Sequence, residues 1–245
     1  MIKLLKSIFI TAIVAMSVLS AASAKEYKEG KDYEVRAENK TTTPEIREFF
    51  SFFCNHCNAM DENFSKVKEH FKSKAKYVYN PIGLLGGDLG VETQFAYAIA
   101  LNIGIEEELR NTLLDKIHNK DELPQDHSYF VDLFASFGVP EDQYERDYSN
   151  FVTQAKVAEY DRKMKELKIE AVPEIVVNGK YFVKSDDLES VEDYINVIDY
   201  LLTLPYCTGR ACLDSAPSEQ TRSESFEVVG NATPSNPHIG NYMGR

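Results

Sequence analysis

Two cysteines separated by two residues, Cys54 and Cys57, form the pattern in this sequence with the clearest capacity for chemistry. They lie in the run Phe-Phe-Cys-Asn-His-Cys. A pair at this spacing closes a small disulfide ring with little distortion, which suits reversible oxidation. Two other uses stay open. The pair could be half of a zinc site completed by Cys207 and Cys212, or a structural disulfide, although so short a loop would stabilise the fold little.

The predicted start of a helix at Cys54 favours the thiolate form of its side chain. Unpaired backbone amides and the positive end of the helix dipole stabilise an anion there, and His56 can add a positive or hydrogen-bonding contribution. A stabilised thiolate is a stabilised reduced state, so the Cys54–Cys57 disulfide becomes a stronger oxidant. We therefore expect the dipeptide Asn55-His56 to tune the pair. A substrate thiolate would attack Cys54, release Cys57, and leave oxidised after a second exchange.

The residues around the pair predict a strand before it and a helix after it. The aromatic run from Ile46 to Phe53 is typical of a central strand covered on both faces, with Cys54 at its end. A following helix is predicted by apolar residues at steps of four, three and four, namely Met60, Phe64, Val67 and Phe71. A short strand over 77–79 should stop at Pro81, which cannot donate to a sheet ladder.

The pattern in the second half of the chain predicts a block of helices followed by a hairpin and a last helix. After the glycine-rich link 83–90, helical periodicity is carried by Val91, Phe95, Ile99 and Ile103, by Leu109, Leu113 and Ile117, by Phe130, Phe134 and Phe137, and by residues 151–167. The strands 174–178 and 180–184 flank Asn178-Gly179, a turn pair that tolerates positive φ. A closing amphipathic helix is predicted from Leu188 to Leu202.

The first 24 residues have the three parts of a secretory signal peptide. Lys3 and Lys6 precede an apolar stretch, which ends before Ala22-Ser23-Ala24. This stretch is shorter than the roughly 20 residues that span a bilayer, so we expect cleavage before Lys25 and a soluble, exported product. The four cysteines then indicate disulfide chemistry.

The formal net charge of −12 argues against nucleic acid or an anionic membrane surface as a partner. Beyond Pro205 the composition shifts to Ser, Pro, Thr, Asn and Gly, which predicts a loosely ordered extension over 205–245.

Three separate stretches resemble the DsbA family of thioredoxin-fold thiol:disulfide oxidoreductases. They are 48–57 around the cysteines, Gly86-Gly-Asp-Leu-Gly90, and Ala171-Val-Pro-Glu-Ile-Val-Val-Asn-Gly-Lys-Tyr181, and the likeness extends over about 27–204. The resemblance implies an α/β, thioredoxin-like fold with an inserted all-helical subdomain. The expected segments are the signal peptide 1–24, a first thioredoxin-like part 25–82, the helical insertion 83–168, a second thioredoxin-like part 169–204 and the extension 205–245.

The resemblance also implies roles for residues outside the Cys-x-x-Cys motif. Val172-Pro173 would be a cis peptide beside the disulfide, where the backbone can pair with an extended substrate; an ordinary trans proline that opens a strand is the alternative. Glu48 would be a buried acid below the cysteines, poised for proton transfer, or else a satisfied charge at a strand edge. Asn55 departs from the family's commonest dipeptide, Pro-His, which leaves the oxidising strength open.

The functional expectation is a periplasmic disulfide oxidase, monomeric and without a cofactor or metal, that acts on reduced exported polypeptides. The family implies reoxidation by a DsbB-like, quinone-linked membrane oxidase. Alternatives are a reductase or isomerase of the same fold, and a non-catalytic module that binds peptide or metal. Cys207 and Cys212 have no counterpart in the family core and would form a local structural disulfide or a second redox pair. We expect surface or packing roles for His70, His118, His127 and His238.

Overall fold

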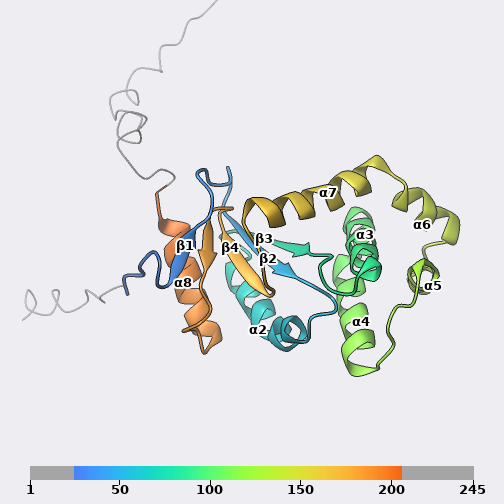
Figure 1. Ribbon diagram of the computed structural model, residues 1–245, viewed down its shortest axis with the longest axis horizontal. Coiled ribbons are helices and arrows are strands. Elements are labelled where there is room, and N and C mark those ends of the chain that lie inside the picture. Colours follow the sequence, from blue (N-terminus) through green and yellow to red (C-terminus); the bar gives the residue numbers. More distant parts are fainter. Residues whose placement is uncertain (1–24, 206–245) are drawn as a thin grey trace, which may run out of the picture. The chain divides into compact units, whose positions relative to one another are not determined.

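Five strands form one mixed sheet in the order β1-β5-β4-β2-β3 in the computed structural model, which describes residues 25–205 (Figure 1). The strands are β1 Tyr33–Val35, β2 Glu45–Phe50, β3 Lys76–Pro81, β4 Glu174–Val177 and β5 Tyr181–Val183. β2 pairs in parallel with β3 and antiparallel with β4. The short strand β1, which carries no clear sequence pattern, pairs antiparallel with β5. The predicted signal peptide and the extension with Cys207 and Cys212 lie outside the described residues.

β2 is the central strand that leads to the cysteines. Ile46, Phe49 and Phe50 are buried, on both faces of the sheet, as the aromatic run predicted. The strand ends at Phe50, so the prediction that it continues to Phe53 and ends at Cys54 is wrong. Residues 51–53 turn instead, and the amide of Cys54 donates to the carbonyl of Ser51 at 3.1 Å. The turn is required because the chain must change direction before a helix can start.

Two helices cover one face of the sheet: α2, Asn55–Phe71, and α8, Val191–Thr203. From α2, Phe64, Val67 and Phe71 are buried in this layer, which confirms the predicted apolar side of the helix, while Met60 is only half-buried. α8 begins with a capping box in which Ser190 and Asp193 bond each other's backbone amides. The position of Cys54 at the start of α2 is therefore set by a helix that packs firmly against the sheet.

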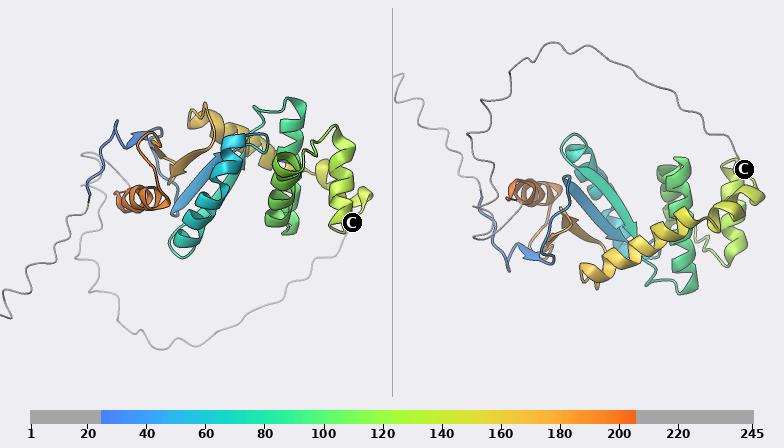
Figure 2. Two further views of the ribbon diagram at one scale, coloured as in Figure 1. Left: turned by 90° about the horizontal axis from the view of Figure 1, so that it is seen from below. Right: turned by 90° about the horizontal axis from the view of Figure 1, so that it is seen from above.

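Five helices lie between β3 and β4 in the sequence. They are α3 Asp88–Ile103, α4 Glu106–Asn119, α5 His127–Ser136, α6 Glu141–Tyr148 and α7 Phe151–Glu166. α3 contacts the other four helices, and its residues 96–100 are all buried, so more of its surface is covered than the predicted apolar stripe. Val91, which was predicted to belong to that stripe, is 41% exposed. α6 was not predicted as a separate helix. Figure 2 shows α7 extending from this helical block back to the sheet.

The turn and edge residues follow local chemistry. Asn178 and Gly179, between β4 and β5, have φ of 54° and 62°, as predicted for a two-residue hairpin turn. β3 includes Pro81, which the sequence placed just past the strand, because an edge strand needs no amide on its outer side. Over residues 25–205, we find no helix of the length and apolarity that a membrane crossing requires.

Candidate redox site

Cys54 occupies the N-cap position of α2. Its backbone is extended, with φ −96° and ψ 110°, and its sulfur accepts a hydrogen bond from the backbone amide of Cys57 at 3.2 Å. A sulfur thus fills the place where Ser, Thr, Asp or Asn usually caps a helix. The helix dipole and the unpaired first-turn amides favour negative charge at this atom. The predicted location of Cys54 at a helix start is therefore confirmed.

The Cys54 sulfur also lies against a loop that is 118 residues away in the sequence. Its thiol donates to the carbonyl of Val172 at 3.5 Å. The Val172–Pro173 peptide is cis, the geometry that the family resemblance implied. Cys54 is therefore placed between the start of α2 and the segment that leads into β4.

Cys57 is the more deeply buried cysteine, 4% exposed against 8% for Cys54, and in the structure both are free thiols. Burial raises the pKa of the Cys57 thiol well above its ordinary value. The hydrogen bond with Cys54 and the negative charge of Glu48 act in the same direction, against a hydrogen bond from the backbone of Ser51. Cys57 is therefore held as a thiol at neutral pH, while Cys54, at the N-cap, is the slightly more exposed of the two.

A buried carboxyl group lies within reach of that thiol's electrostatic field. Glu48, in the middle of β2, is 2% exposed and accepts a hydrogen bond from the hydroxyl of Tyr77 at 2.6 Å. Burial raises the pKa of Glu48, although the charge of Arg110 and the Tyr77 hydrogen bond partly oppose this. Glu48 is thus an interior acid and not a charge at a strand edge.

Arg110 of α4 supplies the buried cation of this region. Its side chain is 2% exposed, pairs with Asp61 of α2, and lies over the ring of Tyr79 at 4.3 Å. Burial lowers the pKa of Arg110, and Glu48 raises it, but a guanidinium keeps its charge in proteins. The pair links α2 to α4 beneath the cysteines. No pattern in the sequence predicts this pair, because Asp61 and Arg110 lie on separate helices.

The dipeptide between the cysteines is exposed, and its two side chains differ in their surroundings. The side chain of Asn55 contacts a ring nitrogen of His118, with 3.1 Å between Oδ1 and Nδ1. The other ring nitrogen, Nε2, lies 2.8 Å from the carbonyl oxygen of Phe52. His118 belongs to α4, and we expected only a surface or packing role for it. No spacing in the sequence relates it to residues about sixty positions earlier.

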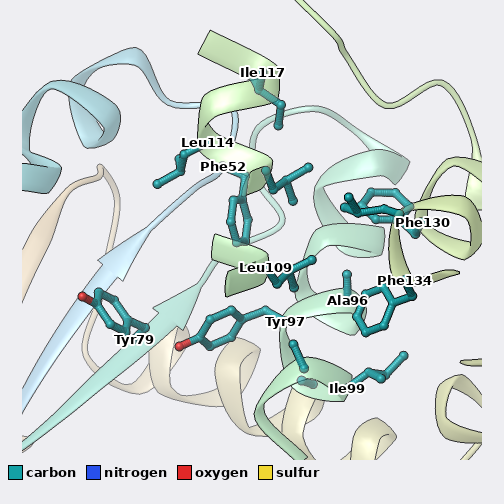
Figure 3. Packing of buried hydrophobic residues seen from close by; sticks show 14 of the residues in the cluster. Phe52, Tyr79, Ala96, Tyr97, Ile99, Leu109, Leu114, Ile117, Phe130 and Phe134 are labelled. Carbon is teal, nitrogen blue, oxygen red and sulfur yellow. The ribbon is translucent and has the colours of Figure 1, made fainter. Parts of the chain in front are cut away.

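The two phenylalanines before Cys54 anchor this segment. Phe52 is fully buried among residues of α3, α4 and α5 (Figure 3). Phe53 lies against Gly86, where a Cβ would come within 2.5 Å of the Phe53 ring. Gly86 also has φ +87°, so both the backbone conformation and the lack of space beside Phe53 favour glycine at this position. The glycine-rich entry to the helical block thus shapes the surface beside Cys54.

The described residues include two of the remaining histidines and allow a search for a metal site. His127 bridges Glu92 and Glu145 within the helical block, and His70 contacts the ring of Phe71. Among residues 25–205, no group of three or more His, Cys, Asp or Glu side chains is arranged to hold a metal ion. Cys207, Cys212 and His238 lie outside this part of the chain.

Comparisons with known proteins agree with the geometry. The model of a family described as DSBA-like thioredoxin domain matches residues 45–196. The thiol:disulfide interchange protein DsbA of Escherichia coli O6:H1 is 28% identical over 199 residues, which cover 78% of this chain and 95% of the relative. That of Dickeya dadantii is 28% identical over 201 residues, 78% and 96% of the two chains.

Solved structures give the same likeness. The crystal structure of a DsbA disulfide interchange protein from Klebsiella pneumoniae has a TM-score of 0.67 and 25% identity, covering 74% of this chain and 100% of the other. The same score, identity and coverage hold for a Proteus mirabilis DsbA variant solved with a non-covalently bound peptide, PWATCDS.

Proposed function

This chain belongs to the DSBA-like thioredoxin domain family and is a thiol:disulfide oxidoreductase, and we propose that it introduces disulfide bonds into exported proteins through Cys54 and Cys57. The observation that carries the proposal is the N-cap sulfur of Cys54, which accepts the amide hydrogen of Cys57. An interaction that favours the Cys54 thiolate favours the dithiol form of the enzyme, and so makes its disulfide a better oxidant.

The reaction is a pair of thiol exchanges. A substrate thiolate attacks the Cys54 sulfur of the Cys54–Cys57 disulfide; the bond between the cysteines breaks, and Cys57 leaves as a thiolate and takes up a proton. A second substrate thiolate then attacks the substrate sulfur of the mixed disulfide and releases Cys54 as a thiolate. The substrate loses two electrons, and the enzyme disulfide gains them and becomes the dithiol. Stabilisation of the Cys54 thiolate assists this last step, because a more stable thiolate leaves faster.

The substrate proposed is an extended segment of a reduced polypeptide. The carbonyl of Val172, 3.5 Å from the Cys54 sulfur, belongs to a loop whose backbone can pair with a bound chain next to the reacting atom. In this proposal Val172 and Pro173 hold the substrate. The Proteus mirabilis relative solved with the cysteine-containing peptide PWATCDS supports it.

Glu48 is proposed to supply the proton that Cys57 takes up. A carboxyl group whose pKa burial raises can hold a proton in the interior and release it when a thiolate forms nearby. Tyr77, the hydrogen-bond donor to Glu48, also lines a hollow of about 230 Å³ between β3 and the helices α3, α4 and α7. We propose that water in this hollow restores the proton of the acid by way of Tyr77. His56 is exposed next to Cys57, where we propose that it adds a positive or hydrogen-bonding contribution.

Equilibration with glutathione tests the oxidase proposal. A Cys207→Ser, Cys212→Ser double variant leaves the Cys54–Cys57 pair as the only one in the chain, and acid quenching followed by alkylation reports its oxidised fraction. We expect a potential well above the about −270 mV of thioredoxin. A value near thioredoxin's would reassign the enzyme as a reductase. Cys54→Ser should abolish turnover; retained turnover would exclude this chemistry.

The cellular setting is part of the same proposal. The predicted signal peptide 1–24 supports a periplasmic location, and an enzyme that ends each cycle as a dithiol needs a partner that removes two electrons. A DsbB-like, quinone-linked membrane oxidase has that chemistry. We propose that the protein acts as a monomer, with Cys207 and Cys212 as a local structural disulfide. A cell-free assay in which such an oxidase restores the disulfide in the dithiol enzyme tests the partnership.

A further inference from the structure

His118 lies at the last turn of α4 and contacts the chain on both sides of Cys54. Nε2 is 2.8 Å from the carbonyl oxygen of Phe52, two residues before the cysteine, and Nδ1 is 3.1 Å from the side-chain oxygen of Asn55, one residue after it. One imidazole ring thus joins two points of the segment that carries the reactive sulfur.

The last turns of α4, which carry His118, pack into the hydrophobic core. The neighbouring residues Leu114 and Ile117 are buried in the same cluster as Phe52 (Figure 3). The ring and the Phe52 carbonyl are therefore kept in place by one packed core. Asn55 has no such support, because it is exposed and stands at the first position of α2. The contact with His118 connects this exposed residue to the core.

The contact with Phe52 requires a hydrogen on Nε2 of the His118 ring. A carbonyl oxygen can only accept, so Nε2 must carry a hydrogen and donate it to Phe52. The Asn55 amide can complete the contact at Nδ1 in either orientation, because its oxygen accepts from a ring N–H and its nitrogen donates to a bare ring nitrogen. The pair His118 and Asn55 is therefore complementary in a way that a proline at position 55 could not be.

We propose that His118 is a positioning residue for the redox pair, which holds Phe52 and Asn55 and thereby fixes the backbone around Cys54 in the dithiol state. The contacts occur in a structure in which both cysteines are free thiols. Their loss removes stabilisation from the dithiol, so the disulfide becomes a weaker oxidant. The inference rests on the proposed exchange through Cys54. It concerns the ratio of the equilibrium constants of variant and parent with glutathione, and not the absolute potential.

The test compares His118→Ala and His118→Gln in the double variant without Cys207 and Cys212. A glutamine amide carries a donor and an acceptor at nearly the separation of the two ring nitrogens, so it can bond Phe52 and Asn55 together. Loss of about one net hydrogen bond in His118→Ala should change the equilibrium constant with glutathione about three- to tenfold toward the enzyme disulfide. His118→Gln should stay within about twofold of the parent. His70→Ala, at the far end of α2, is the matched histidine control and should not change it.

Two further measurements keep the proposal falsifiable if His118→Ala does not fold. Asn55→Ala should shift the same equilibrium in the same direction, and adding it to His118→Gln should remove the rescue. Nitrogen-15 spectra of the reduced enzyme should show the His118 ring protonated at Nε2. An unchanged equilibrium in His118→Ala, an equal shift in His118→Gln, or a ring protonated only at Nδ1 would each overturn the proposal. A wild-type potential like thioredoxin's would overturn the oxidase assignment and leave the His118 ratio standing.

Discussion

The ion pair between Arg110 and Asp61 predicts an asymmetry between two single substitutions. The arginine side chain is 2% exposed, whereas the aspartate side chain is 27% exposed. Removing Asp61 leaves a buried cation without its carboxylate, while removing Arg110 leaves a carboxylate that can turn to water. The substitution of the more exposed partner should therefore be the more harmful one.

The magnitudes follow from what each change leaves behind. Breaking a buried pair by removing one partner costs about 3–5 kcal/mol, and because the charge of Glu48 still acts on Arg110, Asp61→Asn should lie near the lower limit, at about 3 kcal/mol. Arg110→Met loses the contact with the ring of Tyr79, worth about 1 kcal/mol. It also removes a buried charge whose Nε has no hydrogen-bond partner within the described residues. The net cost should stay near about 1 kcal/mol.

Urea and thermal unfolding of the reduced protein, followed by far-ultraviolet circular dichroism, measure both variants. A cost of about 3 kcal/mol corresponds to a fall in Tm of about 6–12 °C for a chain of this size. Glu62→Gln, which breaks an exposed pair with Lys66 on the same helix, is the control and should change nothing measurable. If Arg110→Met proves as harmful as Asp61→Asn, or more so, the reasoning from exposure is wrong.

Three further substitutions test other parts of the structure. Burial raises the pKa of Glu48, so the protonated carboxyl contributes stability that is lost as the pH rises through the folded-state pKa. Glu48→Gln should therefore gain stability relative to wild type as the pH rises above 4.5, which urea unfolding midpoints measure. Burial lowers the pKa of His127, but hydrogen bonds to Glu92 and Glu145 outweigh this, so the net pKa is raised. The resulting stabilisation is fully present below pH 6.5 and is lost as the pH rises through the folded-state pKa, so His127→Gln should flatten the dependence of Tm on pH. The free energy involved is no more than about 1 kcal/mol, because water screens the ring. Gly86→Ala should cost more than about 1 kcal/mol and slow thiol exchange, because positive φ and the Phe53 ring both oppose a Cβ; unchanged exchange kinetics would show that the glycine does not shape the site.

Local patterns in the sequence were sufficient to predict most elements and the position of Cys54. Spacing alone predicted the apolar side of α2, the hairpin turn at Asn178-Gly179 and the place of Cys54 at a helix start, and the structure confirms each. These features depend on residues within a few positions of one another, so near neighbours determine them. Where an element is covered by several others the pattern was less informative: α3 is buried on more sides than a single stripe, and Val91 is exposed.

The surroundings of the two sulfurs were decided by the tertiary structure. The Val172 carbonyl beside Cys54, the His118 ring on Phe52 and Asn55, and the pairing of Arg110 with Asp61 all join residues that are far apart in the chain. Such contacts exist only after the helices have packed against each other and against the sheet, and no periodicity encodes them. The sequence by itself determined the spacing of Cys54 and Cys57 and the place of Cys54 at a helix start. The packing decided which groups surround each sulfur, because fields and hydrogen bonds depend on distance in space and not on distance along the chain.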